Sequence, residues 1–165
     1  MDQKHSSLLI AQGAMIAAAY VVLTVAFAPI SFKEIQIRIS EALTILPLFT
    51  TAAVPGLAVG CLLANILGGA ALPDIVFGSL ATLIGAVGTR LLRNQKPVLA
   101  VVPPIVSNML IVPFVLRYAY GVLLPIPLMM GTVGLGEVIS CGILGLLLYK
   151  VLYAHRKVIF RDKAE

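Results

Sequence analysis

The chain has 165 residues, of which 60% are hydrophobic, and its mean hydropathy is +1.05. A soluble domain of this size cannot bury so much apolar surface, so the composition excludes a soluble protein and indicates an integral membrane protein. The net charge of +5 does not indicate nucleic-acid binding, because many basic residues end or follow the last apolar segment, as in a cytoplasmic flank (Lys150, Arg156, Lys157, Arg161, Lys163). No polar linker divides the chain, so a single transmembrane domain over residues 1–165 is expected.

The first apolar stretch, 7–28, is predicted to be a retained transmembrane helix. Its core is too long for a signal peptide, and Pro29 directly follows the candidate cleavage site. Ala11, Ala14 and Ala18 recur at helical spacing and form a stripe that lets a second helix approach closely.

Four charged residues, Lys33, Glu34, Arg38 and Glu41, lie directly before the next apolar run. Arg38 and Glu41 are three residues apart, so they share a helix face if the second helix begins early. They then either contact a ligand or form a self-contained ion pair, whereas Lys33 and Glu34 are expected to be solvated.

The apolar stretch 42–71 is too long for one span, since a straight helix of that length would measure about 45 Å against a hydrocarbon core of about 30 Å. Pro55-Gly56 interrupts it, which predicts two short helices, 42–53 and 56–71. The second of these carries small residues at every fourth position, which favour helix packing (Gly56, Gly60, Ala64, Gly68).

Three further apolar stretches, 75–92, 98–116 and 128–150, bring the expected total to six spans. With both termini in the cytoplasm, the loop 29–41 then lies outside. The distribution of basic residues fits five spans as well as six, so charge bias alone does not decide between them.

Polar residues inside the predicted spans are few, and Glu137 is the strongest candidate for a functional site. An intramembrane acid costs about 2.5–3.5 kcal/mol near the bilayer centre, so it persists where a ligand or partner offsets that cost. Asp74 can either cap its helix or join a site, and Asn65 and Asn108 can either connect helices or orient a ligand. Cys61 and Cys141 are interpreted as small apolar packing residues.

No motif for catalysis, metal binding or nucleotide binding is present in the sequence. Both histidines lie in the terminal flanks, and no nucleophile and base stand together. The chain is therefore predicted not to be an enzyme, to have no catalytic or metal-ligating residue, and not to hydrolyse ATP itself.

Three segments in order, "IQIRISEALTILP" at 35–47, "PGLAVGCLLANILGG" at 55–69 and "PDIVFGSLATLIGA" at 73–86, closely resemble the QueT family of queuosine-precursor transporters. These are substrate-binding S components of energy-coupling factor (ECF) transporters. The resemblance extends over nearly the whole chain and is most specific across 35–86.

The resemblance implies an all-α bundle of six transmembrane helices in the bacterial cell membrane, with an outward-opening pocket and the loop after the first helix as a lid. It implies a transmembrane scaffold subunit, EcfT, and two cytoplasmic ATPase subunits as partners, so that ATP is used by the partners and this chain needs no cofactor. The Ala14-x-x-x-Ala18 pattern matches the scaffold-docking pattern of the family.

The implied ligand is a 7-deazaguanine base such as preQ1, preQ0 or queuine, which presents two adjacent N–H donors. A carboxylate accepts both as a charge-assisted pair, so Glu137 or Glu41 is expected to bind this edge, with donors from Arg38 or an asparagine for the ring carbonyl. Orienting roles are expected for Asn65, Asp74 and Asn108, and ring stacking for Phe32, Phe49 or Tyr118. The alternatives are an S component for another vitamin such as biotin, a ligand-free membrane assembly subunit, or an intramembrane enzyme.

Overall fold

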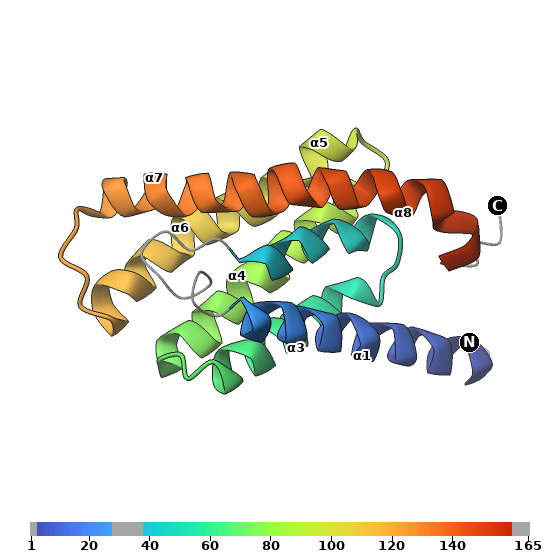
Figure 1. Ribbon diagram of the computed structural model, residues 1–165, viewed down its shortest axis with the longest axis horizontal. Coiled ribbons are helices and arrows are strands. Elements are labelled where there is room, and N and C mark those ends of the chain that lie inside the picture. Colours follow the sequence, from blue (N-terminus) through green and yellow to red (C-terminus); the bar gives the residue numbers. More distant parts are fainter. Residues whose placement is uncertain (1–2, 28–37, 160–165) are drawn as a thin grey trace.

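The computed structural model describes residues 3–27 and 38–159, and these residues form helices and no strand (Figure 1). Phe32, Lys33 and Glu34 lie outside the described residues. The all-helical class predicted from the sequence is confirmed. In chain order the elements are α1 (Gln3–Ala26), η1 (Ile39–Leu48), α3 (Ala53–Leu67), α4 (Leu72–Leu91), α5 (Pro97–Ala100), α6 (Val102–Ala119), α7 (Ile126–Glu137), η2 (Val138–Leu144) and α8 (Gly145–Ile159).

Four helical segments are long and apolar enough to cross a membrane. Large hydrophobic side chains are exposed along them, for example Ile10 at 73% and Leu91 at 75%. So much exposed apolar surface is stable in lipid rather than in water. The four segments are Ser6–Ala26, Leu72–Leu91, Pro97–Ala119 and Ile126–Arg156.

Two shorter apolar helices, η1 and α3, lie between the first and second of these segments. At their helical rises they measure roughly 20 Å and 22 Å, less than the hydrocarbon thickness of about 30 Å. The turn between them covers residues 49–52, which is earlier than the break expected at Pro55-Gly56. Pro55 instead lies in the first turn of α3, where its missing N–H costs nothing.

The helix η1 is a 3₁₀-helix surrounded by other parts of the chain, and most of its residues are buried (Ser40, Glu41, Ala42, Thr44, Ile45, Leu46, Pro47). It contacts α1, α3, α4, η2 and α8. The remaining contacts follow the chain, with α1 on α3, α3 on α4, α4 on α6 and α6 on α7. An irregular and partly polar helix is tolerated at membrane depth because protein, and not lipid, covers it.

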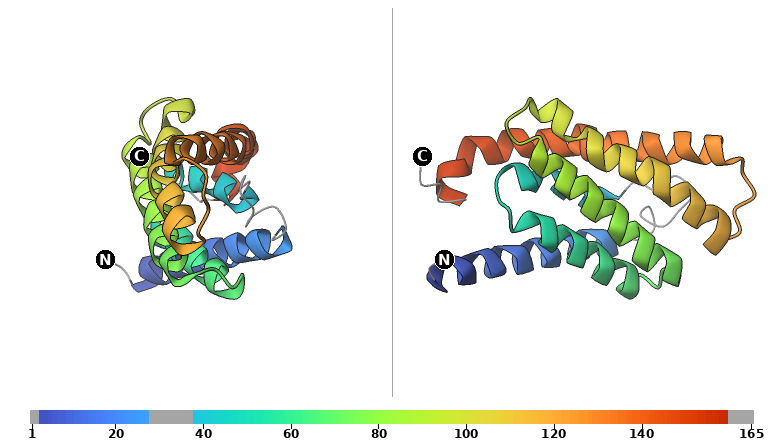
Figure 2. Two further views of the ribbon diagram at one scale, coloured as in Figure 1. Left: turned by 90° about the vertical axis from the view of Figure 1, so that its left-hand side faces the viewer. Right: turned by 180° about the vertical axis from the view of Figure 1, so that it is seen from behind.

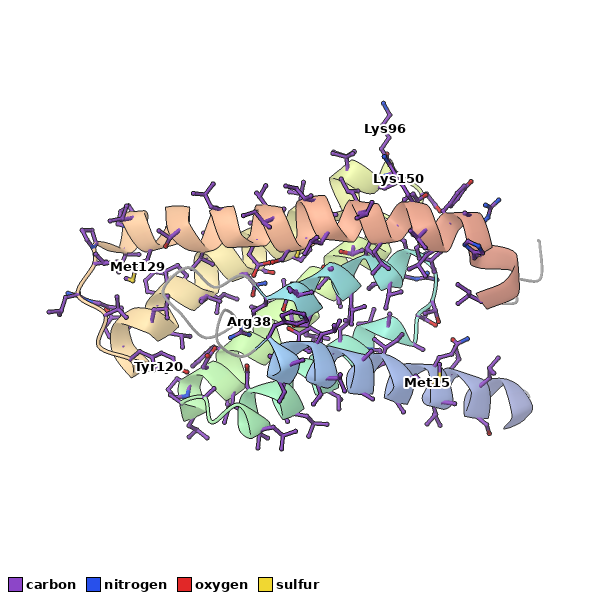
Figure 3. All side chains as sticks on the ribbon, in the orientation of Figure 1. Met15, Arg38, Lys96, Tyr120, Met129 and Lys150 are labelled. Carbon is purple, nitrogen blue, oxygen red and sulfur yellow. The ribbon has the colours of Figure 1, made fainter. Side chains whose placement is uncertain are left out.

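Successive helical segments run in alternating directions, and both termini lie at the same end of the molecule (Figures 1 and 2). Lys96 and Lys150 lie toward that end, whereas Tyr120 lies toward the other (Figure 3). The end of the bundle that holds both termini therefore carries these two basic side chains.

Small residues set the contact between α1 and α3. A Cβ added at Gly56 would lie 2.7 Å from the carbonyl oxygen of Gly13, and one at Gly60 would lie 2.9 Å from Cβ of Tyr20. Gly56, Gly60 and Ala64 are buried, so the predicted packing stripe is confirmed at these positions, whereas Gly68 is exposed at the end of α3.

The predicted alanine stripe of α1 does not face α3. The helix turns Gly13, Ala17 and Tyr20 toward α3, and Ala11, Ala14 and Ala18 are exposed. Ala14 also lines a groove of about 510 Å³ between α1 and α3, together with apolar residues such as Leu9 and Val59.

Candidate functional site

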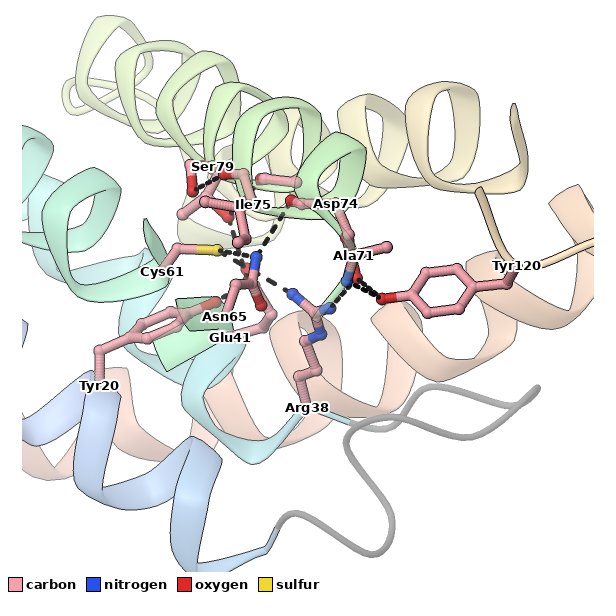
Figure 4. A network of polar contacts seen from close by, with 12 residues as sticks. Tyr20, Arg38, Glu41, Cys61, Asn65, Ala71, Asp74, Ile75, Ser79 and Tyr120 are labelled. Carbon is pink, nitrogen blue, oxygen red and sulfur yellow. Dashed lines mark hydrogen bonds and ion pairs between the residues drawn. The ribbon is translucent and has the colours of Figure 1, made fainter. Parts of the chain in front are cut away.

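All six residues predicted to bind a ligand are buried, and none is more than 4% exposed. They come from η1 and its N-terminal flank, α3, α4, α6 and α7, so they meet only because the bundle folds around η1. Figure 4 shows part of the resulting network, in which Arg38 and Glu41 lie beside Asn65 and Asp74. The six residues are Arg38, Glu41, Asn65, Asp74, Asn108 and Glu137.

The centre of the cluster is a pair of carboxyl groups from distant parts of the chain. A carboxylate oxygen of Glu41, one of Glu137 and the sulfur of Cys141 all lie within 4.8 Å of one another. The Asn108 side chain lies beside both carboxyl groups. Two ionised carboxylates at this separation repel by roughly 3–4 kcal/mol at an effective dielectric constant of about 20, so the pair favours a positive charge or a proton between its members.

Glu41 is held by one of its two carboxylate oxygens. The hydroxyl of Tyr20 donates a hydrogen bond to Oε1, and Thr82 Oγ1 donates to the same oxygen at 3.3 Å. The other oxygen, Oε2, is buried and has no hydrogen-bond partner among the described residues. One half of the carboxylate is therefore fixed, and the other half is an acceptor that no described residue uses.

Glu137 lies where the last long helix changes its winding. The π-helix η2 begins at the next residue and carries both Ser140 and Cys141. Such π segments occur frequently at functional sites, because the wider turn redirects side chains. Cys141 Sγ donates to Glu137 Oε2 at 3.1 Å, and the hydroxyl of Ser140 is buried without a partner among the described residues.

Asp74 forms a second group with Arg38 and Asn65. Arg38 Nη2 lies 3.5 Å from Asp74 Oδ2, which also accepts a hydrogen bond of 3.1 Å from the Tyr120 hydroxyl. Asn65 Nδ2 donates to the Asp74 carbonyl oxygen at 3.2 Å. The start of α4 has no side-chain capping hydrogen bond, so the helix-cap alternative for Asp74 is wrong.

Tyr120, beyond the end of α6, connects this group to the adjacent loops. Its hydroxyl accepts a hydrogen bond of 3.0 Å from the Ala71 N–H while it donates to Asp74. Partial burial raises the pKa of Tyr120, so the phenol stays a donor at neutral pH.

Both cysteines are free and packed in apolar clusters, as predicted, but each also has polar contacts that the sequence did not indicate. Cys141 donates to Glu137, and Cys61 Sγ lies 3.7 Å from Asn65 Nδ2 and 3.9 Å from Arg38 Nη1. Sequence reasoning also missed Tyr20 and Thr82. A usable signal existed for Cys141, which is four residues after Glu137 and therefore on the same helix face, but none existed for the other two.

The proposed stacking residues are not part of the cluster where the structure describes them. Phe49 packs against Tyr149 with ring centroids 5.4 Å apart, and Tyr118 is 80% exposed. Tyr118 lines a separate apolar groove of about 350 Å³ between α4 and α6.

The buried atoms without a hydrogen-bond partner define what the cluster can bind. Among the described residues they include the acceptors Glu41 Oε2, Asn65 Oδ1 and Asp74 Oδ1, the donor Asn108 Nδ2, and the hydroxyl of Ser140, which can do either. Unsatisfied buried polar atoms are costly, so a cluster of them is expected to bind a molecule with complementary groups. Glu41, Glu137 and Cys141 also form the set of described residues whose ligand atoms are close enough to hold a metal ion.

One comparison with known proteins gives a match. A family model described as QueT transporter matches residues 10–154, and no curated protein or solved structure matches the chain at a significant level. The matched range includes all six buried polar residues and nearly all of the described helices. This membrane protein of several apolar helices therefore belongs to the QueT transporter family.

Proposed function

We propose that this chain is the substrate-binding S component of an ECF-type importer, and that it binds a queuosine precursor of the 7-deazaguanine class, such as preQ1, preQ0 or queuine. Membership of a transporter family supports the transport role. The convergence of buried polar groups around η1 supports a small-molecule site within the bilayer.

The observation that carries the proposal is the unpartnered Oε2 of Glu41 beside the carboxyl group of Glu137. The 7-deazaguanine base presents two adjacent N–H donors on one edge, and a carboxylate with a free oxygen accepts them as a charge-assisted pair. Glu137 or Glu41 is assigned to this edge. Asn65 and Asp74 accept further donors, while Asn108 donates to a ring acceptor.

The same proposal gives the chain six membrane-crossing segments, with η1 and α3 as the two short ones. Alternation of the helices and the shared end of the termini support it (Figure 2). Both termini are assigned to the cytoplasm, because Lys96 and Lys150 lie toward the end of the molecule that holds both termini (Figure 3), and Arg156 ends the last apolar segment.

The partners assigned to the chain are the transmembrane scaffold subunit and two cytoplasmic ATPases, which use ATP while this chain carries no cofactor. The exposed positions of Ala14 and Ala18 on α1 support a docking role for this stripe. The site of uptake is the bacterial cell membrane.

The deciding experiment is to purify the chain in detergent and identify any co-bound molecule by mass spectrometry. A 7-deazaguanine base is expected, and isothermal titration with preQ1 then gives its dissociation constant. Recovery of biotin or another unrelated vitamin would replace the proposed substrate, and absence of any bound or titratable small molecule would favour an assembly subunit.

Glu137→Gln tests the site by keeping the side-chain shape and removing its negative charge. Hydrogen bonds to charged groups contribute about 1.5–3 kcal/mol, so affinity for preQ1 is expected to fall roughly 10- to 100-fold. Tyr118→Phe is the control, because the hydroxyl that it removes lies far outside the cluster on an exposed ring. A dissociation constant within about threefold of the parent would remove Glu137 from the site.

A further inference from the structure

The buried cluster holds more acids than bases. Among the described buried residues, Glu41, Asp74 and Glu137 are acidic and Arg38 is the sole basic residue. Arg38 is ion-paired with Asp74 at 3.5 Å. Neither Glu41 nor Glu137 forms an ion pair like this one with a described residue, so their negative charges have no direct counter-ion there.

The direct hydrogen-bond partners of the carboxyl pair are neutral groups. Glu41 accepts from a phenol and an alcohol, those of Tyr20 and Thr82, and Glu137 accepts from the thiol of Cys141. Such donors orient a carboxylate, but they do not balance its charge. A buried charge in a low-dielectric interior is costly unless a counter-charge is present.

The helix ends offer little further compensation. Glu41 lies in the first turn of η1, where the positive end of a helix dipole partly favours an acid. Glu137 has no such help, because α7 continues without interruption into η2 and α8. The hydrogen-bond partners and the helix ends therefore do not balance both negative charges of the pair, which calls for a bound proton or for a cation from outside the described cluster.

We infer that the occupant of this site is a cation, so that within the proposed substrate class the chain selects precursors with a positively charged 7-substituent over neutral ones. This inference rests on the proposed function and adds the charge of the ligand to it. One monocation reduces the excess to a single negative charge, and that remaining charge is what a charge-assisted contact with the N–H edge of a base requires.

The free atoms around the pair agree with such an occupant. Glu41 Oε2 is buried, unpartnered among the described residues, and belongs to the carboxyl pair itself. An ammonium group has three donors and no acceptor, so it can donate to Glu41 Oε2 and to the carboxyl group of Glu137 at the same time. A neutral substituent such as a nitrile offers an acceptor instead, which leaves these oxygens unsatisfied.

The test compares three bases on the purified chain by isothermal titration at neutral pH: 7-aminomethyl-7-deazaguanine, which is a cation, and its 7-hydroxymethyl and 7-cyano analogues, which are neutral. The hydroxymethyl analogue is the matched probe, because it has nearly the same size and retains a donor. Coupling between close buried charges leads us to expect at least roughly tenfold tighter binding of the aminomethyl base. Equal affinities within threefold would overturn the inference while leaving the 7-deazaguanine substrate class intact.

The variants Glu41→Gln and Glu137→Gln provide the second measurement. Each removes one negative charge, so the ratio of aminomethyl to hydroxymethyl affinity is expected to shrink in at least one of them. A ratio as large as in the parent in both would overturn the assignment to this pair. The ratio in the parent protein needs no variant, so a folding defect leaves the test in place.

If none of the three bases binds, the proposed substrate fails, and the charge of the small molecule that co-purifies with the chain decides the inference separately. A molecule with a cationic group supports it, and a neutral or anionic molecule contradicts it.

Discussion

At the scale of single residues, Tyr20 shows how an apolar helix supplies a polar function. It is completely buried in a run of small and aliphatic residues on α1, and its hydroxyl donates to Glu41. The ring packs in the core formed with Leu57 and Cys61, so one side chain connects the packing of α1 on α3 to the orientation of the acid.

Tyr20→Phe is expected to weaken ligand binding while preserving the fold. The substitution keeps the ring and removes the donor that fixes Glu41 Oε1. A hydrogen bond to a charged group contributes about 1.5–3 kcal/mol, so the dissociation constant for preQ1 should rise about tenfold or more. Titration of the purified variant measures this.

Tyr118→Phe serves as the matched control, because the same atom is removed from an exposed ring. If both variants bind like the parent, the Tyr20 hydroxyl does not position Glu41 for binding. A drop in melting temperature of Tyr20→Phe without any change in affinity would assign the hydroxyl to stability alone.

At the scale of elements, the contact of α1 with α3 depends on the absence of side chains. The Cβ of alanine at position 56 would approach the backbone oxygen of Gly13 to 2.7 Å, and backbone cannot rotate away as a side chain can. The two helices must then separate, although no polar group is changed.

Gly56→Ala is therefore expected to destabilise the protein by about 1–3 kcal/mol, in spite of the higher helix propensity of alanine. Gly131→Ala in α7 is the matched control, since nothing lies within 4 Å of the added Cβ and the gain in propensity is then not opposed. Thermal unfolding in one detergent compares them. Equal melting temperatures would show that α1 and α3 can move apart at no cost.

The sequence predicts where the helices lie along the chain better than it predicts whether lipid or protein covers each of them. Runs of apolar residues are sufficient to predict helices in a membrane, and their lengths distinguish the long segments from η1 and α3. The same runs do not show whether lipid or protein covers a helix, so the buried 3₁₀ geometry of η1 was not predicted. The turn at 49–52 was also missed, because proline is as compatible with a first helical turn as with a break.

The cost of polar groups in a bilayer explains what could be predicted of the site. Glu41, Asn65, Asp74, Asn108 and Glu137 were singled out because each is expensive in lipid, and the structure buries them together with Arg38. Tyr20, Thr82 and Cys141 were not, because these side chains are stable in an apolar helix whether or not they meet a carboxylate. Only the tertiary structure shows which of them do.

At the scale of the whole molecule, the proposed ligand site and the proposed docking stripe lie on different parts of the chain. The polar cluster surrounds η1, whereas Ala14 and Ala18 lie on the exposed face of α1. Small side chains exposed to lipid gain nothing from hydrophobic association there, but they allow the backbone of another helix to approach closely. The two surfaces can therefore be tested separately.

The double substitution of Ala14→Leu with Ala18→Leu is expected to abolish docking while leaving ligand binding within threefold of the parent. Added side chains keep a partner helix away from the α1 backbone, but neither position touches the cluster. The measurements are co-purification with the scaffold and ATPase subunits, and ATP-dependent uptake of labelled preQ1 into proteoliposomes that contain all four proteins. Ala19→Leu is the control, because Ala19 is exposed on the same helix but points about 100° away from Ala18 around the helix axis, and its enlargement should preserve both complex and uptake. Normal uptake by the double variant would show that the scaffold binds elsewhere, and loss of both ligand binding and uptake would show that α1 transmits the change to Tyr20 and Glu41 through the α1–α3 contact.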